Sequence, residues 1–515
     1  MKRRGFKPNL RTYHTLLSGY AKAPAAVLTQ GTMERAQNIY NQYKLYCDQL
    51  PPNSTQRSST PTNDYLRILA KSRQYEAMFE VFRDMPPTGP FSPDLVTFTE
   101  LINAIRHRKM PHVVPGDVPT ATEAIVALRN AEDVGLLWKG LVRASELRRF
   151  KIDAYAVAPT IFALARGSAA SREQAFSIVH DYLGFSPDAG TTPKPRNIAL
   201  SSQLLTSVLE LCIITKNHER CVHYATSVMA KPSGHEPRVL QSSHMISALQ
   251  SLAALSTPQS RGVAGQALAF IQWMLQEDAK GGWRRELRPN INAYLQAFLA
   301  CRRAEDWATA CRLFELMSGY CVSDFEQPLV PPELRDCSAP SNHGLPARFA
   351  VLPDPAIMNL MARTAVLSSS SGSEGRLPQP IGQTIPDFGP IYTSLRIISH
   401  LGTDYLFGSL PASRVAQAMD ASRSYRERRT NQRRLATTIL DLHQCLTSLG
   451  GATRVEAEGS NPSATPPSVV PPTFEELQQW KSVKMAALQF VKSVVQRTKQ
   501  PSRTDGQGQQ LEGFR

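Results

Sequence analysis

Hydrophobic residues recur every three to four positions over many short segments of the chain, which is the spacing of one face of an α-helix. In residues 11–23, for example, Tyr13, Leu16, Leu17 and Tyr20 fall on one predicted face. No segment shows a convincing alternation of apolar and polar residues of the kind that strands produce. We therefore predict an all-α protein.

The predicted helices follow one another in pairs that are joined by short polar turns. The pairs are predicted within residues 11–44, 60–85, 96–149, 152–183, 199–230, 239–279 and 292–317, and further helices at 355–367, 391–408, 411–449 and 473–499. For the last helix, Thr473 is the predicted N-cap, with Glu475 and Glu476 favourably placed in the first turn.

One short sequence occurs several times at the start of these pairs. Residues 8–22 read PNLRTYHTLLSGYAK and residues 93–105 read PDLVTFTELINAI, with weaker copies at 288–299 and 352–361. A helix pair cannot bury both of its apolar faces alone, so repeated pairs must stack on their neighbours. The repeats therefore predict an α-solenoid of antiparallel helix pairs, wound as a right-handed superhelix with a concave surface.

This motif resembles the pentatricopeptide repeat (PPR) family, whose units are helix pairs that end in Pro-Asp or Pro-Asn. The resemblance is strongest over 1–108, good at 152–183 and 286–317, and partial at 353–367. The uneven spacing of the Pro-Asp/Asn marks is more similar to fungal or animal mitochondrial members than to the regular plant arrays. Pro8 and Asn9 match the end of a repeat, so we expect further repeat sequence upstream.

The composition along the chain suggests where the array is interrupted and where it ends. We predict a repeat array over 1–368, with loop insertions near 110–125, 184–196 and 319–350, a low-complexity linker at 369–390, a basic helical extension at 391–449, a disordered linker at 450–472, a helix at 473–499 and a disordered tail at 500–515.

The charge balance points to a polyanionic partner. The chain has 58 Lys and Arg residues against 43 Asp and Glu, a net charge of +15. Such an excess favours binding to nucleic-acid phosphates, although solubility or a basic compartment such as the mitochondrial matrix would also explain it. The first acidic residue is Glu34, and an acid-free basic start resembles a mitochondrial targeting segment. We expect a mitochondrial matrix location.

The resemblance also implies which residues would read RNA bases, because in the family one base is read by the polar residue after the first-helix aromatic and by the last residue of the repeat. On this sequence the implied base-reading residues are His14, Asn63, Asp94, Thr99, Asp153 and Asn359, with Val96 as the residue that sandwiches a base. The Asn63 and Asp94 combination is similar to those that favour uridine, and the more widely spaced Thr99 and Asp153 to those that favour guanine. The alternative is that Asn63 and Asp94 cap helices, as Asn and Asp often do.

A second candidate site is an arginine-rich stretch of the predicted 411–449 helix. The predicted phosphate-binding residues are Arg423, Arg426, Arg428, Arg429, Arg433 and Arg434. At helical spacing these guanidinium groups surround the helix, and arginine suits bidentate phosphate contacts. The alternative is a solvated helix surface.

Motifs for catalysis or for a cofactor are absent from the sequence. There is no His-x-Glu with Pro-Cys-x-x-Cys, no phosphate-binding Gly-x-x-x-x-Gly-Lys and no Gly-x-Ser-x-Gly. The eight scattered cysteines indicate buried thiols rather than a disulfide framework, and the cluster His218, Cys221 and His223 indicates an ordinary helix more than a metal site. No apolar run is long enough for a transmembrane helix.

We therefore predict a non-catalytic, monomeric protein without cofactor or metal that binds single-stranded RNA. The resemblance implies mitochondrial RNA processing or stability, translation, or maturation of the small ribosomal subunit. The alternative from a different class is a structural or assembly component of the mitochondrial ribosome, whose solenoid contacts proteins.

Overall fold

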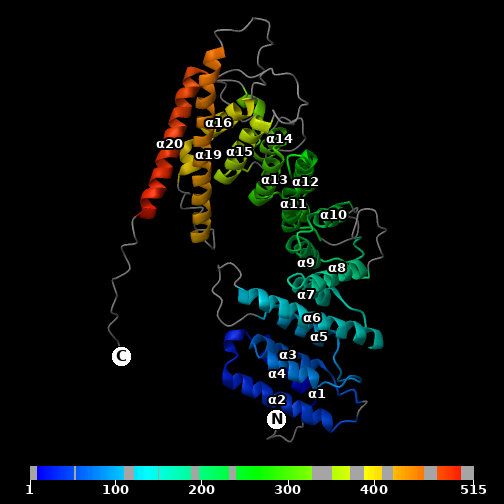
Figure 1. Cartoon of the computed structure of the whole chain (residues 1–515). Helices are drawn as coiled ribbons and strands as arrows, with labels where there is room; N and C mark the ends of the chain where they lie inside the picture. The colour runs from blue at the N-terminus through cyan, green and yellow to red at the C-terminus, as the bar shows by residue number, and fades with distance from the viewer. Residues whose placement is uncertain are drawn as a thin grey trace, which may run out of the picture. The chain divides into compact units, whose positions relative to one another are not determined.

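The structure, a computed structural model, describes residues 8–51, 54–108, 121–148, 150–186, 197–230, 239–326, 351–371, 388–408, 421–456 and 472–499. Within these residues the chain forms helices and turns and no β-strand, so the all-α prediction is confirmed. The chain divides into two compact units, Met1–Ser247 and Ala248–Arg515, which are described separately (Figure 1).

The first unit is a stack of helix pairs. Its helices are α1 (Leu10–Lys22), α2 (Gln30–Asp48), α3 (Thr60–Lys71), α4 (Tyr75–Arg83), α5 (Leu95–Arg106), α6 (Ala121–Arg148), α7 (Ala154–Leu164), α8 (Ala169–Leu183), α9 (Ser202–Ile214) and α10 (His218–Met229), with a 3-10 turn at Ala25–Val27. The first helices of successive pairs, α1, α3, α5, α7 and α9, pack one against the next. The second helices α2, α4, α6 and α8 each pack on their own first helix and on the following one, as the solenoid prediction requires.

The repeated Asn or Asp is the N-cap of five of the first helices, whereas the N-caps of α3 and α9 are Ser59 and Ser201. The side chain of Asn9 accepts a hydrogen bond from the backbone N–H of Thr12 at 3.0 Å, and Asp94 accepts from the N–H of Thr97 at 2.8 Å. Asp153, Asn290 and Asp354 accept from the N–H three residues later in the same way. Each cap satisfies an amide that the first turn of the helix leaves without an intrahelical partner.

The turns inside three of the helix pairs contain a non-glycine residue with a positive φ, which the sequence did not predict. Arg73, Lys216 and Glu305 have φ values of 61°, 59° and 55°, and each lies two residues before its second helix begins. The amide of the following residue bonds back to the carbonyl five residues earlier, which ends the first helix in a Schellman-type turn. Glycine usually occupies this left-handed position, so without a glycine the sequence does not indicate where these turns lie.

The second unit continues with helix pairs and then adds an extension. Its helices are α11 (Ser242–Leu255, which crosses the division), α12 (Arg261–Ala279), α13 (Ile291–Ala304), α14 (Trp307–Ser318), α15 (Pro355–Ser371), α16 (Gly389–Leu401), α17 (Thr403–Phe407), α19 (Ala421–Glu456) and α20 (Phe474–Lys499), with 3-10 turns at Gly282–Leu287 and Val322–Phe325. Helix α13 packs on α12, α14 and α15. The long helices α19 and α20 lie side by side, and α19 also packs along α15 (Figure 1).

Several predicted boundaries differ from the structure. Helix α6 begins at Ala121, inside the predicted 110–125 insertion, and α19 runs to Glu456, beyond the predicted end at 449. The predicted helix 391–408 is two helices, because Gly402 breaks it with a φ of 83°. The rest of the predicted insertions and linkers, at 109–120, 187–196, 327–350, 372–387 and 457–471, lies outside the described residues, as does the tail at 500–515. No described helix is long and apolar enough to cross a membrane.

One residue that the periodicity placed on a buried face is exposed. Leu16 has 46% of its surface accessible. The first helices of a solenoid pack against two or three neighbours in irregular directions, so a single helical face does not define their buried side. Tyr13 and Leu17, from the same predicted face as Leu16, are buried.

A buried ion pair fixes the last helix to the extension. Arg396 of α16 donates to both carboxylate oxygens of Glu476, at 2.8 and 3.2 Å, and also to the backbone carbonyl oxygen of Glu326 at 2.8 Å. Both side chains are only 7% exposed. Glu476 also accepts from the N–H of Thr473, whose hydroxyl accepts from the N–H of Glu476, so the predicted cap at Thr473 is part of a reciprocal capping box.

Because removing one partner of a buried pair leaves a charge without compensation, we expect Arg396→Met to destabilise the second unit by about 3–5 kcal/mol. Arg396→Met/Glu476→Leu should recover most of this loss, short of about 1 kcal/mol for the capping box. Denaturant unfolding monitored by circular dichroism measures both values.

The matched control is Arg312→Met, which removes the partner of Glu315 from a pair in which Arg312 is 50% exposed. It should cost less than about 1 kcal/mol. Equal losses from Arg396→Met and Arg312→Met would show that the buried pair does not hold α20 in place.

Candidate nucleic-acid interface

The starts of the first helices in unit 1 present side chains at equivalent positions. The residue two places after each Asx cap is exposed in three pairs: Arg11, Val96 and Tyr155. Val96 is 46% exposed and Tyr155 is 75% exposed, although both are large hydrophobic side chains. Since α5 and α7 pack against each other, Val96 and Tyr155 begin neighbouring helices. Val96 was predicted from the sequence and Tyr155 was not, although Tyr155 has the same offset from its cap, Asp153.

Asn63 and Asp94, the pair with the best spacing in the sequence, are in direct contact. The Asn63 amide Nδ2 donates to Asp94 Oδ1 at 3.1 Å, and the Thr97 hydroxyl donates to Asn63 Oδ1 at 2.7 Å. Ser59 donates to the other carboxylate oxygen of Asp94. This network joins the start of α3 to the start of α5.

The same network buries the amide. Asn63 is only 4% exposed, so a base could use its amide only if the side chain turned out of these bonds. Asp94 is half-buried and caps α5, as the alternative interpretation of the sequence stated. Base contact by Asn63 and Asp94 stays a prediction, whereas their structural role between two repeats is visible.

Hydrogen bonds set the ionisation of Asp94. Burial by itself would raise the pKa of this carboxyl, but bonds from Ser59, Thr97 and Asn63 outweigh it and hold the pKa below its usual value of 3.8. Asp64, one residue after Asn63, is affected in the opposite direction because burial raises its pKa more than His14 and Arg67 lower it.

Charged side chains near these helix starts pair with one another. His14 Nε2 lies 3.4 Å from Asp64 Oδ2, and Arg67 lies 3.4 Å from Asp64 and 2.5 Å from Glu100. This charge ladder, made of His14, Asp64, Arg67 and Glu100, connects α1, α3 and α5. His14 is 46% exposed, so of the predicted base-reading residues it remains accessible.

The other two predicted base readers in unit 1 bond within their own helices. The hydroxyl of Thr99 donates to the carbonyl oxygen of Leu95 at 2.7 Å, and Asp153 accepts from the N–H of Ala156 at 3.0 Å. Both side chains are half-buried. Their use as a joint base-reading pair stays a prediction.

An arginine-aromatic cluster lies between α5 and the end of α7. The guanidinium carbon of Arg166 lies 3.7 Å from the ring centroid of Phe162, and that of Arg106 lies 5.4 Å from it. Arg166 also pairs with Glu210 of α9. Burial and the nearby charge of Arg166 lower the pKa of Arg106. The members of this cluster come from three repeats, so no local sequence pattern indicates it.

In unit 2 the extension covers the predicted base reader Asn359. Asn359 is 6% exposed, and its side-chain oxygen Oδ1 accepts a hydrogen bond from the hydroxyl of Thr438 on α19 at 2.7 Å. This placement speaks against base contact by Asn359, because α19 occupies the position that a base would need. No local pattern in the sequence indicates that α19 packs along α15.

The predicted phosphate-binding arginines of α19 have different surroundings. Arg428 is half-buried and donates to the carbonyl oxygen of Tyr405 at 3.1 Å, while Arg429 is half-buried and Arg433 and Arg434 are exposed. The side chains of the two remaining members of the run, Arg423 and Arg426, lie outside the described residues. Only Arg433 and Arg434 are therefore seen open to solvent.

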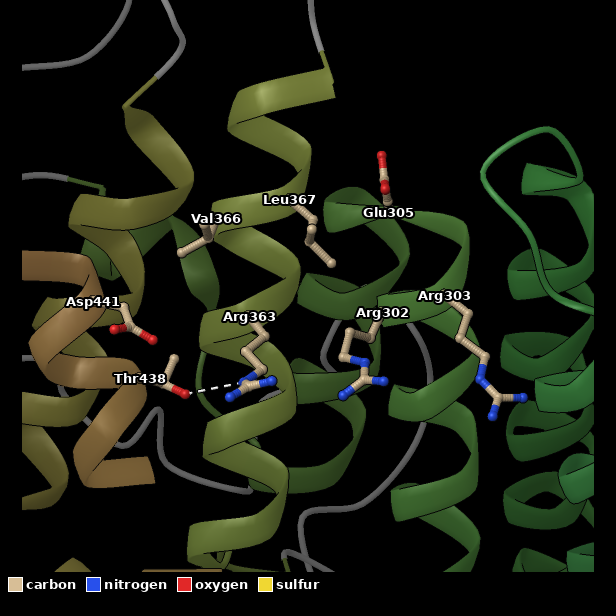
Figure 2. Close-up of a pocket in the computed structure, with 8 residues that line it drawn as sticks. All are labelled: Arg302, Arg303, Glu305, Arg363, Val366, Leu367, Thr438 and Asp441. Atoms are coloured by element: carbon tan, nitrogen blue, oxygen red, sulfur yellow. Dashed lines mark hydrogen bonds between the residues drawn. The ribbon is translucent and has the colours of Figure 1, made fainter. Parts of the chain in front are cut away.

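A pocket that the sequence did not indicate lies beside Arg434. It has a volume of about 500 Å³ and is lined by Arg302 and Arg303 at the end of α13, Arg363 of α15 and Thr438 of α19, among others (Figure 2). The adjacent arginines Arg302 and Arg303 were the only sign of a basic site at this place in the sequence. Arg363 lies beside them only because α15 packs on α13.

The described residues offer no metal site. No group of three His, Cys, Asp or Glu side chains among them could hold an ion. In the cluster His218, Cys221 and His223, the Cys221 thiol is buried and lies 3.8 Å from the carbonyl oxygen of Ser247.

The packing of its helices defines the chain as an α-helical repeat protein. No known family model matches the sequence, and no curated protein matches it. Solved structures similar to it include the pentatricopeptide repeat protein PPR10 from maize, at 13% identity over 97% of this chain and 76% of that chain, with a TM-score of 0.18. PPR10 in complex with an 18-nt psaJ RNA element is similar over the same shares at 12% identity and a TM-score of 0.20. These neighbours carry the family name that the repeat motif suggested, and the fold class itself rests on the packing described above.

The lowered pKa of Asp94 predicts a pH-dependent contribution to stability. A carboxyl whose folded-state pKa is depressed stabilises the fold above its usual pKa of 3.8 and loses this contribution as the pH falls through the folded-state value. We expect Asp94→Asn to cost about 1 kcal/mol at neutral pH and progressively less below about pH 4. Thermal unfolding of both proteins across this pH range measures the difference.

Asp153→Asn is the matched control, since Asp153 also caps a first helix with one backbone bond. A difference between wild type and Asp94→Asn that stays constant down to the lowest accessible pH would contradict the assigned hydrogen bonds.

Proposed function

We propose that this protein binds single-stranded RNA along the starts of its first helices and does not act as an enzyme. The observation that carries the proposal is the pair of exposed apolar side chains, Val96 and Tyr155, at equivalent positions of neighbouring repeats, next to the polar Asn63–Asp94 contact. Single-stranded RNA is recognised by stacking its splayed bases on such side chains and by polar groups beside them, one base per repeat in helical repeat proteins.

The charge of the protein supports the same partner. A net charge of +15 favours a polyanion, and Arg433 and Arg434 are exposed on α19. Guanidinium groups bind phosphate oxygens through paired N–H donors, which position an RNA backbone without selecting its sequence. RNA is also the partner that the resemblance to the PPR family implies.

We further propose a role in mitochondrial gene expression, in RNA processing or stability, translation, or maturation of the small ribosomal subunit. The loosely spaced repeats, which are similar to those of mitochondrial members of the family, support this setting. Crosslinking of the tagged protein in cells, followed by sequencing of the bound RNA, tests location and target together. Recovery of only non-mitochondrial RNA would contradict the proposal.

One observation favours a second candidate, in which unit 1 contacts protein, as a structural or assembly component of the mitochondrial ribosome would. The charge ladder of His14, Asp64, Arg67 and Glu100 is of mixed character, because two carboxylates lie against one arginine and one histidine. A surface dedicated to phosphates would be expected to carry an excess of positive charge.

The stacking role of Tyr155 separates the two candidates. Because Tyr155 is 75% exposed, Tyr155→Ala should change the free energy of unfolding by no more than about 0.5 kcal/mol. It should weaken RNA binding by about 1–3 kcal/mol, the usual value of a base stacked on an aromatic ring. Fluorescence polarisation with labelled oligo(U), oligo(A) and oligo(C) measures the affinities.

Phe474→Ala is the matched control, because Phe474 is an aromatic residue with the same 75% exposure in the other unit. It should leave all affinities unchanged. Tight RNA binding that is identical in wild type and Tyr155→Ala would remove Tyr155 from the interface, and no RNA binding by the wild type would favour the protein-contact alternative.

A further inference from the structure

The pocket between α13, α15 and α19 concentrates positive charge. In Figure 2 the guanidinium groups of Arg363, Arg302 and Arg303 lie in a row, in that order, across α15 and α13. Arg434, on the adjoining turn of α19, is close enough to affect the ionisation of Arg302. Burial and the charges of Arg363, Arg303 and Arg434 all lower the pKa of Arg302, which is the result expected when like charges are brought together.

The hydrogen bonds of these arginines do not neutralise them. Arg303 donates to the backbone carbonyl oxygen of Ala253 at 2.6 Å, and Arg363 donates to the Thr438 hydroxyl at 3.1 Å. Both acceptors are uncharged. In the described parts of the chain, no ion pair within 4.0 Å involves these three pocket arginines or Arg434, in contrast to the charge ladder of unit 1.

Two carboxylates lie near the pocket and do not balance it. Asp441 of α19 lines one side, and Glu305 lies at the rim, where its carboxylate points away from the three guanidinium groups (Figure 2). The net charge around the pocket therefore remains positive. Binding of an anion would offset the repulsion between the clustered guanidinium groups and stabilise the fold.

Helix α19 closes the pocket on one side. The first helices α13 and α15 pack side by side. Helix α19 lies against α15, where the Thr438 hydroxyl donates to the side-chain oxygen of Asn359. The Thr438 hydroxyl also accepts a hydrogen bond from Arg363, so the same residue of α19 contacts both Asn359 and the pocket. Arg302 and Arg303 lie at the opposite end of α13 from its Asn290 cap, so the pocket is separate from the row of helix starts.

We propose that this pocket binds the terminal phosphate of an RNA strand. The proposal rests on the RNA-binding function proposed above and names the part of the RNA that this site recognises. A terminal phosphate monoester carries a charge of up to about −2 and three acceptor oxygens, against one charge and two free oxygens for a phosphodiester within the chain. Several converging guanidinium groups suit the monoester better, because each can place paired N–H donors on it.

The test compares oligonucleotides of one sequence that carry a 5′-phosphate, a 3′-phosphate or hydroxyl groups at both ends. For the full chain we expect one of the two phosphorylated forms to bind about tenfold more tightly than the hydroxyl form, the size of effect typical of a charge-assisted hydrogen bond. Which form gains affinity identifies the end of the strand that enters the pocket. Fluorescence polarisation at fixed salt concentration gives the three dissociation constants.

The variant Arg302→Gln/Arg363→Gln should abolish this tenfold preference and leave the affinity for the hydroxyl form within about threefold of wild type. Arg312→Gln, on the outer helix α14, is the matched control and should keep the preference. Removing like-charge repulsion should leave the unfolding temperature of the double variant unchanged or raise it, which circular dichroism checks.

The wild-type comparison decides the proposal even if the double variant misfolds. Equal affinity for all three oligonucleotides overturns the pocket proposal and leaves RNA binding intact. An equal loss of affinity for all three in Arg302→Gln/Arg363→Gln assigns the arginines to internal phosphates and also overturns it. Failure of the wild type to bind any of them overturns the proposed function itself.

Discussion

The hydrogen bond between a repeated Asn or Asp side chain and the backbone amide three residues later is the interaction on which the rest of the structure depends. It begins α1, α5, α7, α13 and α15, and so sets where these five first helices start. Because neighbouring first helices pack side by side, their starts are then aligned from one repeat to the next. The row of side chains that could meet a ligand follows from this alignment.

Asp94 shows how a cap can also connect repeats. Its carboxylate caps α5 and simultaneously accepts bonds from Ser59 and Asn63 at the start of α3. The same two residues that resemble a base-reading pair are therefore part of the packing between repeats. Their side chains are held in a fixed geometry, which selective recognition requires. The same hydrogen bonds limit how much of the Asn63 amide a base can reach.

The two units use charge differently. In unit 1 the ladder from His14 to Glu100 pairs basic with acidic groups, and Arg166 pairs with Glu210. In unit 2 the arginines at the α13, α15 and α19 junction have uncharged acceptors, and the buried Arg396–Glu476 pair serves the extension instead. The arginines at this junction of unit 2 are thus available to an anionic ligand.

The sequence by itself determined the all-α class, the helix pairs, most helix boundaries within a few residues and the Asx caps, because these depend on local periodicity and on bonds that span three residues. Only the tertiary structure decided that Leu16 is exposed, that Tyr155 and Val96 stand on neighbouring helices, and that α19 covers Asn359. It also brought Arg363 beside Arg302, sixty-one positions earlier in the sequence. Such contacts depend on how distant helices pack, and no short-range pattern of residues encodes that packing.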